Sequence, residues 1–160
     1  MSTTEPAAPL FEVRLLQMSL AVVRRSSEHN DELLREFALI RDEGSDQVPA
    51  RLLALMEELR SRFASFSAGP TAALEAAMEG PQEEIDLVYQ VPMETRQAVA
   101  QLGAMLDEAD DFCRAGDLLT LATPPEALAF RRWFLDEFVR QLDGEPPRSW
   151  PDAIGAGAGG

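Results

Sequence analysis

Residues 107–150 read DEADDFCRAGDLLTLATPPEALAFRRWFLDEFVRQLDGEPPRSW and decide the fold of this chain. The stretch holds most of the aromatic residues and a double proline, and a proline in a first helical turn gives up only an N–H that has no helical partner. Phe130, Phe134 and Phe138 follow at steps of four, so a helix places all three on one face. The pattern predicts a long amphipathic helix that ends at Gly144.

The start of that helix has the form of a capping box. Thr123 precedes the two prolines and Glu126 follows them. In a capping box the threonine hydroxyl accepts a hydrogen bond from a backbone N–H of the first turn, while the glutamate reaches back to the N–H of the threonine. The sequence therefore predicts that Thr123 caps the helix.

Four further helices are predicted from apolar residues at steps of three and four. They cover approximately residues 20–42, 49–66, 70–80 and 92–115. Pro49 and Pro70 are placed to begin the second and third of these helices, since proline suits the first turn. Gly116 is expected to end the fourth as a left-handed cap.

Two short strands complete the predicted elements, near residues 11–18 and 84–91. The second is the clearer one, because Ile85, Leu87 and Tyr89 alternate with mostly polar residues. The first is a compact apolar run that also fits a helix start, although a strand is favoured. Parallel and antiparallel pairing are both allowed. The predicted fold class is mainly α (α+β), with about five helices and a minimal two-stranded sheet.

Length and composition bound the domain organisation. The chain has 160 residues, of which 46% are hydrophobic, and this is enough for one buried core. We expect a single helical α+β domain over residues 10–151. Residues 1–9 are polar and contain proline, and residues 152–160 are small and rich in glycine, so flexible tails are expected at both ends.

Charge and targeting signals exclude several partners. The net charge is −14, and all 14 basic residues are arginine. Nucleic acids and anionic membranes are bound through clustered positive charge, so neither is an expected partner. The sequence has no apolar run of membrane-spanning length and no signal peptide, which predicts a cytoplasmic protein.

Few residues of familiar catalytic or metal sites are present. His29 is the only histidine, which leaves histidine-ligated zinc and serine or cysteine triads without support. We expect His29 on a solvated helix surface, the acidic run 107–111 on another, and Cys113 in the core. No phosphate-binding or dinucleotide-binding glycine motif occurs, so no cofactor, no metal and no catalytic residue is predicted.

Arg131, Arg132, Trp133 and Trp150 are the candidate partner-binding residues, because arginine and tryptophan dominate the binding energy of interfaces. A structural role is the alternative for each. Arg132 could belong to an ion-pair ladder with Asp136 and Arg140 at steps of four. Trp150 could fold back as a plug over the core.

Three segments carry a resemblance to known proteins. They are SSEHNDELLREFALI (26–40), DEADDFCRAGDLL (107–119) and LLTLATPPEALAFRRWFLDEFVRQLDGEPPRSWP (118–151). Together they resemble a group of small acidic actinobacterial proteins that occur beside serine-kinase-type anti-sigma ATPases, STAS-domain antagonists and PPM-type serine phosphatases. The resemblance covers residues 11–151 and implies a role in partner-switching regulation of transcription.

The resemblance favours an adaptor over an enzyme. The anti-sigma ATPases combine an asparagine-bearing helix with a DxGxG loop, and here Asn30 has no such loop downstream. We therefore expect a non-enzymatic regulatory protein that binds an anti-sigma kinase, a STAS protein or a serine phosphatase. A homodimer is compatible with the several apolar helix faces.

Two other functions remain open from the sequence. The first is a small-molecule sensor that binds an apolar ligand among four aromatic residues, namely Phe63, Phe112, Phe130 and Phe134. The second is a metal-dependent hydrolase that uses Asp110 and Asp111.

Overall fold

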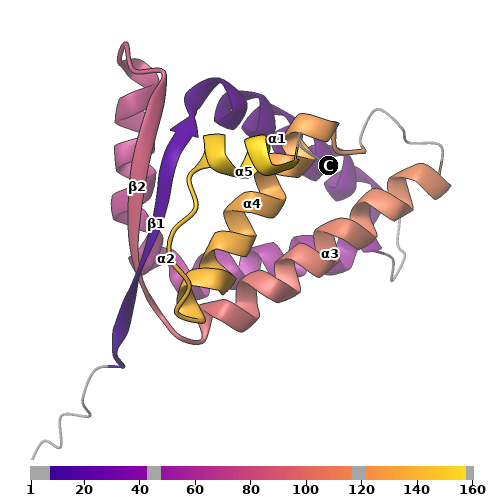
Figure 1. The fold of residues 1–160 in the computed structure, drawn as a ribbon. Helices are drawn as coiled ribbons and strands as arrows, with labels where there is room; N and C mark the ends of the chain where they lie inside the picture. The colour runs from indigo at the N-terminus through magenta and orange to yellow at the C-terminus, as the bar shows by residue number, and fades with distance from the viewer. Residues whose placement is uncertain (1–7, 43–47, 117–121, 158–160) are drawn as a thin grey trace, which may run out of the picture.

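The computed structural model describes residues 8–42, 48–116 and 122–157 (Figure 1). The described chain is mainly helical and has a small antiparallel sheet, which confirms the predicted fold class. The elements follow the order β1 (Leu10–Ser19), α1 (Leu20–Asp42), α2 (Val48–Glu79), β2 (Glu84–Pro92), α3 (Thr95–Ala115), α4 (Pro125–Leu142) and α5 (Trp150–Gly157). None of the described helices combines the length and apolar content needed to cross a membrane.

The two predicted strands exist and pair with each other in antiparallel orientation. Phe11 lies opposite Val91 and Leu15 opposite Leu87. Val13, Leu15, Leu87 and Val91 are all buried, as the alternation of side chains across a strand requires. The sheet therefore presents one apolar face to the helices.

A bulge interrupts β1 where the register shifts between Leu15 and Met18. Gln17 has a φ of 54°, in the left-handed region that non-glycine residues rarely adopt. The carboxylate of Asp86 on β2 accepts a hydrogen bond of 2.7 Å from the backbone N–H of Gln17. Met18 is thereby returned to the buried face of the sheet, at 1% exposure.

Helix α2 is a single helix of 32 residues, so the prediction of a break and a new helix at Pro70 is wrong. Its two halves run in different directions (Figure 1), and a proline inside a helix removes a backbone hydrogen bond and promotes such a bend. The second half continues because Leu74 and Met78 pack against the core beside the sheet. Tertiary packing therefore outweighs the local preference of proline for a helix start.

The C-terminal end of the chain is more ordered than the sequence predicts. Residues 150–157 form α5, whereas a flexible tail was predicted from residue 152. The helix is held because Trp150 is buried and Ala153 packs against the same core. Residues 1–7 and 158–160 of the predicted tails lie outside the described residues.

Gly116 ends α3 with a φ of −93°, so it is not the left-handed cap that was predicted.

The buried apolar residues form two separate clusters. The larger one, called here the aromatic core, joins the sheet to α4 and Trp150. The smaller one joins α1, α2 and the second half of α3 around Phe37, Leu52 and Cys113. A domain of this size usually has one contiguous core, so the division marks a region between α1, α2, α3 and α4 where packing is incomplete.

Candidate functional site

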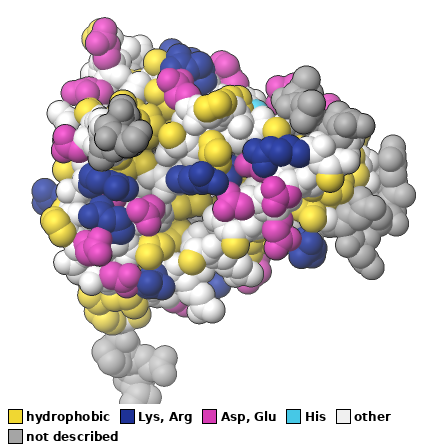
Figure 2. Space-filling view, turned by 45° about the vertical axis from the view of Figure 1, so that its right-hand side comes forward, with side chains coloured by type: hydrophobic (Ala, Val, Ile, Leu, Met, Phe, Trp, Pro, Cys, Tyr) yellow, Lys and Arg dark blue, Asp and Glu magenta, His cyan; other side chains and the backbone are white. Residues whose placement is uncertain are grey.

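An open groove of about 810 Å³ lies between α3, α4 and α5. All four predicted contact residues line it, and they are Arg131, Arg132, Trp133 and Trp150. Small residues of α3 form much of its floor, namely Ala100, Gly103 and Ala104. On the face shown in Figure 2, arginine and acidic side chains are interspersed with apolar surface and form no patch of a single sign.

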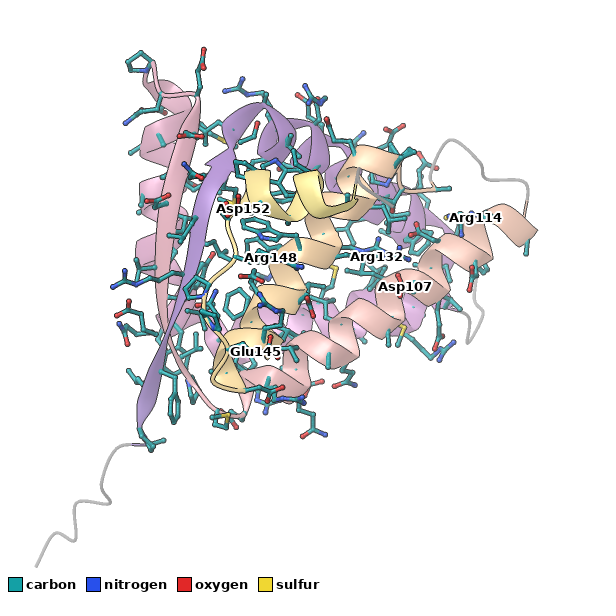
Figure 3. The ribbon with its side chains drawn as sticks, viewed as in Figure 1. Asp107, Arg114, Arg132, Glu145, Arg148 and Asp152 are labelled. Carbon is teal, nitrogen blue, oxygen red and sulfur yellow. The ribbon has the colours of Figure 1, made fainter. Side chains whose placement is uncertain are left out.

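Charges of both signs line the rim of the groove. Arg132 is 65% exposed and lies 3.9 Å from a carboxylate oxygen of Asp107 on α3. On the other side, Arg148 lies 3.4 Å from a carboxylate oxygen of Asp136. Figure 3 labels Asp107, Arg132 and Arg148 on this side of the molecule. Exposed ion pairs of this kind contribute little to stability, so little free energy is lost when their charges pair with a partner protein instead.

The two tryptophans form the wall of the groove and offer almost no free surface. Trp133 is 3% exposed and Trp150 is 5% exposed, and their ring centroids lie 5.5 Å apart. The indole N–H of Trp133 donates a hydrogen bond of 2.8 Å to the backbone oxygen of Arg148. The alternative that Trp150 plugs the core is confirmed. Because both tryptophans are buried, neither offers surface for direct contact with a partner.

Glu137 was not predicted from the sequence, and it supports the wall that the two tryptophans form. Its side chain is fully buried, and Arg140 on the next turn donates a hydrogen bond of 2.6 Å to it. The backbone N–H of Arg148 donates another of 2.6 Å. Gln141 donates a third, of 3.3 Å, and its amide also pairs with the backbone of Arg14 on β1. Glu137 thus holds the segment before α5 against α4, and its partner Gln141 connects α4 to the sheet.

The same contacts replace the ion-pair ladder expected along α4. Asp136 pairs with Arg148, and Arg140 pairs with Glu137 and Glu145. Within the described residues, Arg132 pairs only with Asp107 of α3. The ladder prediction is wrong because neighbouring segments bring competing charges to each residue, which spacing along one helix does not reveal.

Arg131 is the least exposed charged residue of the groove and belongs to a buried cluster. Its side chain is 13% exposed and donates hydrogen bonds of 2.7 Å to Asp107 and 3.1 Å to Asp110. Asp110 also accepts hydrogen bonds from the backbone N–H and the hydroxyl of Thr123. Burial favours the neutral carboxyl, but the bonds from Thr123 and the charge of Arg131 outweigh it and lower the pKa of Asp110.

This cluster overturns the predicted capping box. Pro124 is the N-cap of α4, and no side chain of the described residues caps the helix. The hydroxyl of Thr123 donates 2.7 Å to Asp110 instead, and Arg131 donates 3.1 Å to that hydroxyl. In a capping box the hydroxyl would accept from a backbone N–H, whereas here it accepts from the charged Arg131 and donates to the carboxylate of Asp110, and hydrogen bonds to charged groups are the stronger ones.

His29 lies beside the cluster and is half-buried, which corrects the prediction of a solvated position. Its Nε2 atom is buried and has no hydrogen-bond partner among the described residues. Burial lowers the pKa of His29 from its ordinary value of 6.5, and the nearby charges of Asp110 and Glu32 offset only part of that shift. The ring is therefore held in its neutral form at neutral pH.

The acidic run does not gather its carboxylates into one site. Asp110 is buried with Arg131, whereas Asp111 is 81% exposed and pairs with Arg114. Within the described ranges, no group of three histidine, cysteine, aspartate or glutamate residues is placed to hold a metal ion. Cys113 is fully buried, as predicted, and burial raises the pKa of its thiol.

The aromatic residues predicted to surround a ligand are divided. Phe63, Phe130 and Phe134 line two cavities between the helices that open to the surface. Phe112 instead packs edge-to-face on Phe37 in the smaller cluster, with ring centroids 5.8 Å apart.

Comparison with protein-family models, with curated proteins and with solved structures gave no match to this chain.

Proposed function

We propose that this chain is a non-enzymatic regulatory protein that acts by binding another signalling protein in the groove between α3, α4 and α5. The observation that carries the proposal is the make-up of the groove. Its floor is apolar and built from small residues, and its rim carries Arg132 and Arg148 beside Asp107 and Asp136. An apolar centre with a charged rim is the usual anatomy of a protein interface.

A helix is the occupant that this shape favours. Ala100, Gly103 and Ala104 lie one turn apart on α3, so a partner backbone can approach closely. The rim charges of both signs would then fix the orientation and register of the bound segment. We propose that the partner is an anti-sigma kinase, a STAS protein or a serine phosphatase, as the sequence resemblance implies, and that occupation of its surface changes which other protein it binds.

The test is direct binding to purified partners of these three classes from the same organism, measured by calorimetry. We expect at least one to bind, and we expect Ala104→Trp and Arg132→Glu each to weaken that binding at least tenfold. Ala104 is exposed on the floor, so the larger side chain fills the groove without entering the core. Arg35→Glu is the matched control, because this exposed arginine of α1 does not line the groove.

Two results contradict the proposal. One is that none of the three classes binds the wild-type chain. The other is that a partner binds and both groove variants retain wild-type affinity, which would place the interface elsewhere. Thermal unfolding of each variant shows whether a loss of binding reflects a loss of fold.

A further inference from the structure

Two cavities lie in the incompletely packed region between the two core clusters. The first has a volume of about 250 Å³ and the second about 290 Å³. Met56, Leu102, Phe134 and Leu135 line both, so the cavities adjoin each other. We call the pair the chamber. Its combined size falls in the range of small-molecule sites, which begins at roughly 300 Å³.

One residue that lines each cavity carries a buried hydroxyl group without a partner. Ser26 lines the first cavity and is 7% exposed, and Thr95 lines the second and is 6% exposed. Neither hydroxyl oxygen has a hydrogen-bond partner among the described residues. Buried polar groups in folded proteins are nearly always paired, so two unpaired hydroxyls on residues that line adjoining cavities point to a missing partner. Both oxygens are themselves buried, so a ligand reaches them only after rotation about χ1 turns them toward the cavities.

The charged residues around the chamber indicate whether a ligand that enters it can itself carry a charge. Among the described residues, Arg131 is the only charged one lining the first cavity, and Asp107 and Asp110 already neutralise it. Arg60 is the only one lining the second cavity, and it is exposed. A charged ligand group inside the cavities would lose its hydration and would meet no free countercharge there, because Arg60 lies at the exposed edge, where it pairs with Glu57. The remaining lining is mainly aliphatic and aromatic.

We propose that the chamber binds one neutral, elongated, largely hydrocarbon molecule whose hydroxyl or carbonyl oxygens pair with Ser26 and Thr95. Asn30 at the edge of the first cavity and Arg60 at the edge of the second are both exposed, so both cavities reach the surface. This site is separate from the groove proposed for a protein partner, and neither proposal depends on the other.

Binding is tested with the hydrocarbon fluorophore diphenylhexatriene and the full chain at pH 7. We expect saturable fluorescence enhancement and displacement of the fluorophore by 1-decanol. Decanoate and decyltrimethylammonium have the same chain length with opposite charges, and each should need at least tenfold higher concentration. Absence of saturable binding, or equal competition by either charged compound, overturns the proposal.

Filling variants locate the bound molecule. Ala127→Leu adds volume to the first cavity and Ala98→Leu to the second, and each should weaken diphenylhexatriene binding at least tenfold. Ala54→Leu is the matched control, because Ala54 is an exposed residue of α2 that lines neither cavity. If the folded filling variants bind the fluorophore as wild type does, the molecule sits on the surface and the proposal fails.

A double variant, Ser26→Ala with Thr95→Val, tests the hydroxyls without adding bulk. Diphenylhexatriene has no polar atom, so its affinity should be unchanged. The affinity of 1-decanol should fall by about three- to tenfold, as expected for the loss of a neutral hydrogen bond. An unchanged affinity for 1-decanol means that the hydroxyls do not contact the ligand and contradicts their proposed role.

Discussion

Buried polar groups are treated in opposite ways in the aromatic core and in the chamber. Beside the aromatic core, the carboxylate of Glu137 is fully buried and receives hydrogen bonds from Arg140, Gln141 and the backbone of Arg148. In the chamber, the hydroxyls of Ser26 and Thr95 are nearly as buried and have no partner among the described residues. The hydrogen bonds of Glu137 stabilise the fold, whereas the hydroxyls of Ser26 and Thr95 leave hydrogen-bonding capacity unused beside the cavities.

The largest expected effect comes from breaking the paired group. Glu137→Ala leaves the N–H of Arg148 and the amide of Gln141 short of a partner and should lower the free energy of unfolding by about 3 kcal/mol. The value stays at the lower end for a broken buried ion pair because Arg140 keeps Glu145. Urea unfolding measures the loss. The exposed neighbour Asp136→Ala is the control and should change stability by less than about 1 kcal/mol.

A smaller effect should appear as pH falls, in two separate windows. The folded pKa of His29 lies below 6.5, so the unfolded chain takes up a proton first, and stability should fall as the pH drops below 6.5. The folded pKa of Asp110 lies below its ordinary value of 3.8, so its contribution is complete above that pH and is lost below it.

Unfolding by urea at a series of pH values separates the two groups. The variant His29→Gln should flatten the profile just below pH 6.5, and Asp110→Asn should flatten the acidic end while lowering stability at neutral pH. A wild-type profile with no decline between pH 6.5 and 5.5 would argue against the buried, neutral histidine.

The smallest expected effect is in the chamber, and its sign differs from that at Glu137. The double variant Ser26→Ala with Thr95→Val removes two unpaired buried hydroxyls and should leave the unfolding free energy unchanged or raise it by about 1 kcal/mol. Thermal unfolding without ligand is sufficient to measure this. A loss as large as that of Glu137→Ala would mean that both hydroxyls are paired in the folded protein and would remove the contrast between the two regions.

The predictable parts of the fold are those that follow from local periodicity. The alternation at Ile85, Leu87 and Tyr89 located β2, and the spacing of Phe130, Phe134 and Phe138 located α4. The break predicted at Pro70 shows where this reasoning stops, because packing of the second half of α2 on the sheet continues the helix. Helix α5 at the end of the chain is a second case that local periodicity did not predict, because this helix depends on the burial of Trp150.

The candidate site was predictable only as a set of residue types. Arginine and tryptophan were expected to mark a contact surface, and Arg131, Arg132, Trp133 and Trp150 do line one groove. Burial of Trp150 was weighed from the sequence, but neither the burial of Trp133 nor the place of Arg148 and Asp136 at the rim was predicted. Glu137 was missed because a glutamate on a helix is normally solvated, and one of its partners, the backbone N–H of Arg148, comes from a segment eleven residues away.

The sequence by itself determined most of the helical and strand segments, the absence of clustered positive charge and the scarcity of familiar catalytic residues, because these depend on residue type and local spacing. Tertiary structure alone decided the antiparallel sheet, the hydrogen bond from the backbone of Arg148 to Glu137, the lowered pKa of His29 and the chamber lined by Ser26 and Thr95. Each of these depends on which groups from distant segments meet, or fail to meet, in a low-dielectric interior.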